Sequence, residues 1–595
     1  MFLNNQRKKW IACSATVVLT IIVLAWVMKL WKADLSVPFT YSGDGLYYST
    51  VVKGMIDNGW YLHNDYVGMP GGLDLHDFPE HDNVLYGLIK AVSLFTSGYA
   101  EALNIYFLLT FPLTALIALL VFRHFGFSYS ASLLGSLLFT FLPYHFMRGE
   151  VHLPLSSYYL VPPMVMLVLW VFQEKPLFWK EAEGRRVLDA GADSLLALVI
   201  CLLVASNVYY AFFGCFFLLV AGLATASRVK AVRPLATAGV LIVVVVLGFV
   251  INLLPHFVYN LQHGKNPKAL VRKYGAPEKF GLKISQLLFP VTGHRVPFLQ
   301  KAKDLYNENV QYVNENDFAT LGIVGGIGFL LLVAWIYIGG FFQRGPPGEP
   351  GIAGLLRALS LLNLSAVMLS ATGGFAIFIG LLVTPKIRGY NRISVYIAFF
   401  SFFAVVALLD KVRRRYAASG LSRAIFSAGL VLLLGIGILD QTTEGFVPPY
   451  DALKKELSVR TTFVRSIEST LPDKAMVFQM PYIAFPESKP IHRMHDYDHF
   501  GGGYLVSKTL RWSYGAMKGR ATDDWQRTVS EKPLPEFLAD LISTGFSGIT
   551  VDTFGYADAG AELESRLAAA LGVKPLVSPD GRYLFFNLEA SKRAR

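Results

Sequence analysis

The chain has 595 residues, of which 53% are hydrophobic, 14% aromatic and only 16% charged, and its mean hydropathy is +0.44. This composition lies outside the range of soluble globular proteins and indicates an integral membrane protein. The formal net charge of +12 does not require a nucleic-acid partner, because short basic loops between apolar segments account for much of it.

Apolar segments long enough to cross a hydrocarbon core of roughly 30 Å recur along the chain. The first is preceded by Arg7, Lys8 and Lys9 and lacks a small-residue cleavage site, so we expect a retained anchor with a cytoplasmic N-terminus. With that orientation the Lys/Arg-rich loops fall on the cytoplasmic side, as the positive-inside rule requires. We predict about eleven spans, at residues 10–31, 104–122, 130–147, 155–172, 193–206, 208–226, 234–255, 318–341, 355–372, 392–409 and 422–439.

An odd number of spans places the more polar C-terminal part on the outer side. We therefore predict a transmembrane domain over residues 1–440, with outer loops at 33–103, 148–154, 256–317 and 373–391, and an extracytoplasmic α/β domain over 441–595. In that domain "AMVFQMPY", "GITVDTF" and "RYLFFNL" are typical of strands, and "LPEFLADLISTGF" and "AGAELESRLAAALG" of amphipathic helices. The three cysteines all fall in predicted spans, which excludes an outer disulfide framework and a cysteine-based zinc site.

The first outer loop is crowded with polar residues. Asp44, in "YSGDGLYY", lies between two glycines, which permit a sharp turn and the close approach of a ligand to the backbone. A turn-forming aspartate is the alternative. Trp60 offers an aromatic face on which a sugar can stack.

The second half of this loop mixes structural and functional candidates. Asp82 or Asn83 is a good N-cap for a helix over residues 84–95. Asp77, Glu80 and His81 are candidates for contacts to substrate hydroxyls or a metal ion, with simple solvation as the alternative.

Two further outer loops carry carboxylates. The second loop reads "RGEVHL" and supplies Glu150 and His152, and the long third loop ends "NENVQYVNENDF", with Glu308 and Glu315. Carboxylate oxygens and an imidazole suit Mn²⁺ or Mg²⁺, so Asp44, Glu150 and His152 are a possible ligand set. Alternatively, Glu150 and His152 orient a polar substrate.

The fourth outer loop contains an apolar piece, residues 375–383, that is too short to cross. If it crossed, the basic stretch "KVRRR" would lie outside, so we expect it to be re-entrant or interfacial. Lys386, Arg388 and Arg392 then lie on the outer surface. The two arginines either extend to lipid headgroups or bind the phosphate of a lipid-linked substrate, with Tyr390 adding a hydrogen bond.

Outer carboxylates beside a phosphate-sized basic site indicate chemistry between a polar acceptor and a lipid-phosphate donor. Glycosyl transfer fits these parts. A carboxylate near an acceptor hydroxyl acts as general base, and arginines stabilise the charge that develops on the leaving phosphate.

In these features the chain resembles the GT-C superfamily of membrane glycosyltransferases. The resemblance implies that Asp44 takes the place of an essential aspartate in the first outer loop, and that a glutamate of the long loop, Glu308 or Glu315, takes part. The chain departs from the oligosaccharyltransferase-like members, because "GEVHL" replaces an acidic pair and no Trp-Trp-Asp motif follows. It looks more like uncharacterised bacterial members that modify cell-surface glycans.

The resemblance implies an inverting transferase in a bacterial inner membrane, with its site and C-terminal domain facing the periplasm. It would move a sugar from a polyprenyl-phosphate or -diphosphate donor to a glycan, lipid or protein acceptor. Asp44 would be the general base or positioning carboxylate, and Arg388 and Arg392 would bind the donor phosphate. The rival hypotheses are a transporter or flippase of lipid-linked sugars, which would need ionisable residues at midplane depth, and a non-catalytic envelope-glycan assembly protein.

Overall fold

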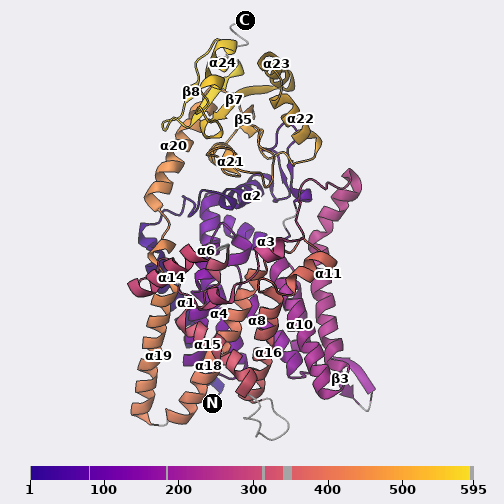
Figure 1. Ribbon diagram of the computed structural model, residues 1–595, viewed down its shortest axis with the longest axis vertical. Coiled ribbons are helices and arrows are strands. Elements are labelled where there is room, and N and C mark those ends of the chain that lie inside the picture. The colour runs from indigo at the N-terminus through magenta and orange to yellow at the C-terminus, as the bar shows by residue number, and fades with distance from the viewer. Residues whose placement is uncertain are drawn as a thin grey trace.

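The computed structural model describes residues 2–78, 81–182, 185–189, 191–310, 315–338, 351–417 and 419–589. The molecule is elongated, with a bundle of long helices at one end, a small α/β part at the other, and short helices between them (Figure 1). The helix bundle contains α1 (Phe2–Met28), α4 (Tyr99–His124), α5 (Tyr129–Thr140), α8 (Val161–Phe172), α9 (Ala192–Val204), α10 (Val208–Val229), α11 (Arg233–His263), α15 (Gly322–Ile338), α16 (Ile352–Ser370), α18 (Ser394–Tyr416) and α19 (Gly420–Gln441).

Within the described residues, seven helices are long and apolar enough to cross a membrane, and three further apolar helices are shorter. A helix occupies each predicted span, but two spans predicted as continuous helices are wrong. Residues 130–147 divide into α5 and α6 (Pro143–Arg148), and residues 155–172 divide into α7 (Leu153–Ser156) and α8. The helix after each break, α6 and α8, carries proline in its first turn, where the missing N–H has no helical partner to lose.

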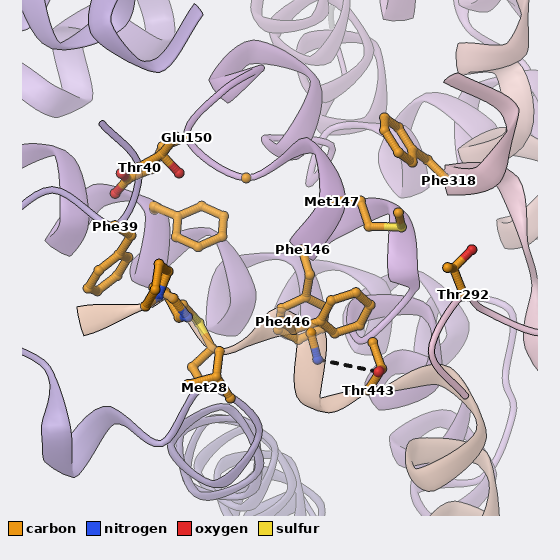
Figure 2. Close-up of a pocket in the computed structure, with 16 residues that line it drawn as sticks. Met28, Phe39, Thr40, Phe146, Met147, Glu150, Thr292, Phe318, Thr443 and Phe446 are labelled. Carbon is orange, nitrogen blue, oxygen red and sulfur yellow. Dashed lines mark hydrogen bonds between the residues drawn. The ribbon is translucent and has the colours of Figure 1, made fainter. Parts of the chain in front are cut away.

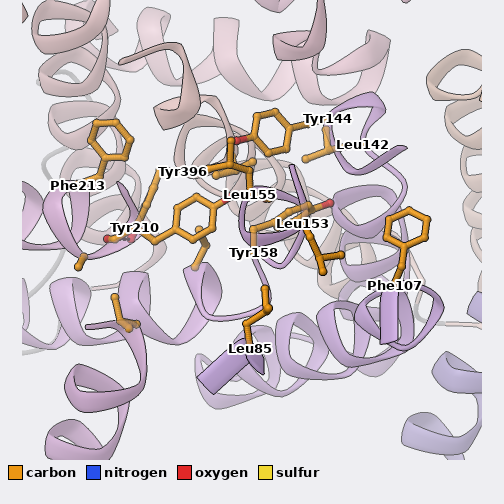
Figure 3. Close-up of a cluster of buried hydrophobic side chains, with 14 of the residues drawn as sticks. Leu85, Phe107, Leu142, Tyr144, Leu153, Leu155, Tyr158, Tyr210, Phe213 and Tyr396 are labelled. Atoms are coloured by element: carbon orange, nitrogen blue, oxygen red, sulfur yellow. Dashed lines mark hydrogen bonds between the residues drawn. The ribbon is translucent and has the colours of Figure 1, made fainter. Parts of the chain in front are cut away.

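Buried tyrosines pack around these breaks (Figure 3). The Tyr158 hydroxyl donates to the carbonyls of Phe139 and Thr140, at 2.9 and 3.1 Å, where α5 ends and carbonyls have lost their helical partners. The Tyr396 hydroxyl donates to the carbonyl of Tyr210 at 2.8 Å and ties α18 to α10. The broken segment is therefore fixed within the bundle by hydrogen bonds as well as by apolar contacts.

Short elements connect the bundle helices. At the end of the bundle nearer the α/β part, α3 begins at Asn83 and the side chain of Asp82 accepts from the Leu85 N–H, so the predicted N-cap is confirmed. α17 has only seven residues, in agreement with a segment too short to cross. These elements are η1 (Leu30–Lys32), α2 (Asp44–Asn58), β1 (His63–Asn64), β2 (Leu73–Asp74), η2 (Leu75–Asp77), α3 (Asn83–Ser93), β3 (Phe178–Ala182), β4 (Arg185–Asp189), α12 (Ala276–Lys279), α13 (Ile284–Leu288), α14 (Pro297–Asn309), η3 (Glu315–Ala319), α17 (Ala376–Leu382), η4 (Tyr390–Ile393) and η5 (Glu444–Phe446).

The C-terminal part is built on a five-stranded sheet with the order β6-β5-β7-β9-β8. β5 runs parallel to β6 and β7, whereas β9 runs antiparallel to β7 and β8. β7 is buried along its whole length, including its polar residues Ser547, Thr550 and Asp552. The strands and helices predicted here are confirmed. The elements are α20 (Tyr450–Glu468), β5 (Met476–Met480), α21 (Asp498–Gly501), η6 (Tyr504–Val506), β6 (Arg511–Trp512), α22 (Ala521–Ser530), α23 (Leu534–Thr544), β7 (Phe546–Asp552), η7 (Thr553–Gly555), α24 (Ala561–Leu571), β8 (Leu576–Val577) and β9 (Tyr583–Asn587).

Polar contacts join the C-terminal part to the loop that follows α1. Arg520 donates two hydrogen bonds to Asp77, of 2.6 and 2.7 Å. On another side, the Lys454 ammonium of α20 lies 2.8 Å from a carboxylate oxygen of Asp34. α2 lies beneath α21 and contacts it (Figure 1), so α2 lies between the helix bundle and the C-terminal part.

Candidate active site

Asp44 is the first residue of α2. The preceding Gly43 has φ +52°, a conformation that favours glycine, so the sharp turn expected from the sequence is present. A carboxylate at this end of a helix also benefits from the positive end of the helix dipole. The side chain is 48% exposed, which leaves it accessible to a ligand.

The structure brings Asp44 and His152 together. Nε2 of His152 lies 3.6 Å from Oδ2 of Asp44. Burial, together with the neighbouring Arg148 and Arg392, lowers the pKa of His152 to about 3, so the imidazole is neutral and the contact is not an ion pair. Burial and the carboxylate of Glu487 raise the pKa of Asp44 to about 6, against the opposing effect of nearby arginines. Asp44 is therefore largely ionised at neutral pH and is a stronger base than an ordinary aspartate.

A first pair of arginines holds Glu315. Arg148 lies 3.0 Å and Arg392 3.6 Å from the same carboxylate oxygen. Although burial alone would raise the pKa of Glu315, the two arginines outweigh it and lower this pKa to about 2. The structure thus brings Glu315 to the arginines, whereas Glu308 lies exposed on α14.

The position of Arg392 corrects the sequence prediction. Arg392 is only 8% exposed, and its guanidinium lies over the Tyr209 ring, 4.2 Å from the ring centre. It therefore neither lies on the outer surface nor extends to lipid headgroups, because Glu315 and Tyr209 provide partners inside the protein. Arg388 remains partly exposed, with 33% of its side chain accessible.

A second pair of arginines holds Glu487, which comes from the C-terminal part. Arg272 binds both carboxylate oxygens of Glu487, one of them at 2.8 Å, and Arg388 lies 3.7 Å away. Sequence reasoning missed Arg272 and Glu487, because each lies in an irregular segment without a motif. Glu487 and Arg388 are near Asp44 in the fold, since both act on its pKa.

Glu150 faces a different space from Asp44. It is 2% exposed and lies beside Thr40 on the wall of a largely apolar pocket of about 390 Å³ (Figure 2). Burial raises the pKa of Glu150 to about 8, although the backbone N–H groups of Phe39 and Thr40 oppose the shift, so the carboxyl is protonated at neutral pH. The pocket is lined by Met28, Phe39, Thr40, Phe107, Phe146, Met147, Gly149, Glu150, Thr292, Phe318, Thr443, Gly445, Phe446, Val447, Pro448 and Pro449.

The Phe318 ring connects the pocket to Arg148 of the first arginine pair. The guanidinium of Arg148 lies over the ring of Phe318, 4.6 Å from its centre, and Phe318 lines the pocket. On the far wall the rings of Phe146 and Phe446 stack with their centres 4.6 Å apart. Because Met28 ends α1 and Thr443 follows α19, the pocket lies at the level where bundle helices end.

Other predicted site residues lie elsewhere or have other partners. Asp77 is bound by Arg520 and also accepts from the side chain of Asn266 at 3.0 Å, so it is engaged in the contact between the two parts. The remaining predicted residues are Trp60, 37% exposed and packed on Tyr61; His81, edge-on to Phe249; Lys386, exposed; Tyr390, fully buried; and Glu80, which lies outside the described residues.

The predicted metal ligands do not form a set. Among the residues that the structure describes, no three His, Cys, Asp or Glu side chains are placed to hold a metal ion. Asp44 and His152 face each other, whereas Glu150 faces the apolar pocket as a protonated acid. Residues 44, 150 and 152 therefore do not fit a Mn²⁺ or Mg²⁺ site in this arrangement.

No protein-family model matches the chain, and no curated protein matches it in sequence. Among solved structures it is similar to the Archaeoglobus fulgidus oligosaccharyltransferase in the apo form, with 12% identity and a TM-score of 0.44 over 97% of this chain and 74% of that one. AglB from the same organism, in complex with an inhibitory peptide and a dolichol-phosphate, gives 13% identity and a TM-score of 0.39 over 98% and 74%. The arabinofuranosyltransferase AftD from Mycobacteria gives 12% identity and a TM-score of 0.41, over 92% of this chain but only 35% of that one. Such low identities and TM-scores say nothing about activity.

Proposed function

We propose that the protein is a membrane glycosyltransferase that moves a sugar from a polyprenyl-phosphate-linked donor to a glycan, lipid or protein acceptor. The observation that carries this proposal is the position of Asp44. A carboxylate with a pKa of about 6 lies beside a neutral histidine and within the field of Arg388 and Arg392, where the helix bundle meets the C-terminal part. In our proposal this face is the periplasmic side of a bacterial inner membrane.

The chemistry is a displacement at the anomeric carbon. Asp44 accepts the proton of an acceptor hydroxyl while the hydroxyl oxygen bonds to the anomeric carbon and the bond from that carbon to the phosphate oxygen breaks. Attack from the face opposite the phosphate inverts the configuration of the sugar. The negative charge that forms on the leaving phosphate is stabilised by Arg388 and Arg392, which stay protonated throughout.

The apolar pocket supplies a place for the first isoprene units of the donor lipid. Phe318 lines the pocket and packs against Arg148, so in this arrangement a donor with its hydrocarbon chain in the pocket has its phosphate near the arginines. Protonated Glu150 supports this assignment, because it leaves the pocket without a buried charge at neutral pH.

The test compares wild type with Asp44→Asn in nanodiscs and follows labelled sugar leaving a panel of polyprenyl-phosphate and -diphosphate donors, with native glycan extract as acceptor. Asp65→Asn is the matched control, because Asp65 is an exposed carboxylate of the same loop. We expect transfer by wild type and the control and a loss of at least ~100-fold in Asp44→Asn. Equal turnover in all three proteins would contradict the role of Asp44. Movement of intact lipid-linked sugar across the bilayer without transfer would favour a flippase.

A further inference from the structure

Two carboxylates near Asp44 are each held between two arginines. Glu315 lies between Arg148 and Arg392, and Glu487 lies between Arg272 and Arg388. An arginine fork binds two carboxylate oxygens with the same geometry that it offers to two phosphate oxygens. Each arginine pair is thus arranged to hold a phosphate group, and each holds a protein carboxylate in this structure.

The two carboxylates differ in how firmly they are placed. Glu315 is bonded to Arg148, whose side chain is 1% exposed, so this pair forms part of the packed interior. In the second pair Glu487 is 31% exposed and Arg388 33% exposed, whereas Arg272 is 13% exposed, so a ligand reaches this pair from the side of Glu487 and Arg388. Removing a carboxylate from a buried arginine leaves an uncompensated charge, whereas an accessible arginine exchanges one anion for another at little cost. Glu487 is therefore the carboxylate that a ligand can displace.

Glu487 lies outside regular secondary structure. It lies in the long irregular connection between β5 and α21, whereas both of its arginine partners belong to the membrane part of the chain. Within the C-terminal part, this connection is anchored nearby by the N–H of Ser488, which donates to Asp496 at 3.0 Å. A rotation of the Glu487 side chain alone would free Arg272 and Arg388.

We propose that Arg272 and Arg388 form a subsite for the second phosphate of a diphosphate-linked donor, and that Glu487 is a protein carboxylate that occupies this subsite until the donor displaces it. This inference rests on the proposed function, because it takes a phosphate-linked donor as given. A sugar joined to a lipid through one phosphate carries one negative charge, and through a diphosphate two. A monophosphate balances the charges of the four arginines, Glu315, ionised Asp44 and Glu487 with Glu487 in place, whereas a diphosphate reaches the same balance when it displaces Glu487.

The test measures binding of methyl geranyl diphosphate and methyl geranyl phosphate, diesters that carry two and one negative charges as the sugar-linked donors do, to the full chain in nanodiscs by calorimetry, so it needs no transfer reaction. We expect wild type to prefer the diphosphate by about ten-fold, the effect of one charge-assisted hydrogen bond. Arg272→Gln should lose this preference while it keeps its affinity for the monophosphate. Glu487→Gln should bind the diphosphate about ten-fold more tightly, because the competing carboxylate is gone.

Lys454→Gln is the matched control, because it removes a different ion pair between the same two parts of the molecule, and it should bind both probes as wild type does. Arg272→Lys, which keeps the charge without the fork, should show an intermediate preference and serves if Arg272→Gln fails to fold. Equal binding of both probes by wild type, an unchanged preference in Arg272→Gln, or weaker diphosphate binding in Glu487→Gln would overturn the subsite.

The two proposals fail separately. Diphosphate binding that depends on Arg272, combined with normal transfer by Asp44→Asn, would leave the subsite standing and refute the catalytic role of Asp44. Transfer from a monophosphate donor that depends on Asp44 and is unaffected by Arg272→Gln would refute the subsite and leave the glycosyltransferase standing.

Discussion

Replacing Asp44 by Asn should abolish transfer and, at the same time, stabilise the fold. Burial and Glu487 raise the pKa of Asp44 from its usual value of 3.8 to about 6, so the folded protein holds this proton more tightly than the unfolded chain does. Stability therefore falls as the pH rises from about 4 to about 6 and stays lower above that range. Asparagine carries no charge, so the variant escapes this cost at neutral pH.

The size of the effect follows from the pKa and from the exposure of the side chain. A shift of about two pKa units corresponds to about 3 kcal/mol. Because 48% of the Asp44 side chain is exposed, solvent screens much of this electrostatic cost. We therefore expect Asp44→Asn to raise the free energy of unfolding by about 1 kcal/mol at pH 8 and to leave it unchanged at pH 4. The free energy of unfolding is compared through thermal melting of both proteins in nanodiscs at each pH.

Two results would refute this reasoning. A variant that melts below wild type at pH 8 would show that the carboxylate makes net favourable contacts. A gain of equal size at pH 4 and pH 8 would show that the charge is not the cause. Activity of wild type should rise with pH through about 6, since only ionised Asp44 accepts a proton, and a flat profile there would assign the base elsewhere.

Three further predictions concern the pocket, the contact between the two parts, and the bundle. Glu150→Gln should fold normally. Because the pKa of Glu150 is raised from 4.5 to about 8, wild type should lose stability relative to this variant as the pH rises between those two values. Thermal melting of both proteins at pH 5 and pH 8.5 checks this. Asp77→Asn should cost about 2 kcal/mol, because it leaves the partly buried Arg520 unpaired, and limited trypsin digestion should release the C-terminal part faster than in wild type. Gly328→Ala should cost about 2–3 kcal/mol, because its Cβ would lie 2.2 Å from the Ser401 carbonyl oxygen, whereas Gly239→Ala, whose Cβ meets nothing within 4 Å, should leave the melting temperature unchanged or slightly higher.

Features that depend on neighbouring residues were predictable from the sequence. Apolar runs indicated the positions of the bundle helices, and short stretches rich in Val, Ile, Tyr and Phe indicated the C-terminal strands. Asp82 was a predictable cap, because an N-cap depends only on the next few residues. The break before Pro143 had a local signal too, since proline ends a preceding helix, and the prediction of one continuous span overlooked it.

Features that depend on distant pairing were not predictable. Arg272 and Glu487 are 215 residues apart, and neither lies in a motif. Asp77 looked like a ligand for substrate because its partner, Arg520, is 443 residues further along the chain. The choice between Glu308 and Glu315 also had no local basis, because only the fold determines which of them meets Arg148. One sequence shows which charges a loop carries but not which of them are already paired.

The contact between Asp77 and Arg520 also sets the order of events during synthesis. The loop after α1 is made early, but Arg520, which anchors it, is made 443 residues later. Glu487 is made only shortly before Arg520. At roughly 5–20 residues per second, this loop waits about 20 to 90 seconds for its partners. During that interval Asp44 has no C-terminal part beside it. The nascent chain is therefore inserted in the membrane well before it possesses a complete site, and a ribosome that stalls in the last quarter of the message leaves an inserted but incomplete protein.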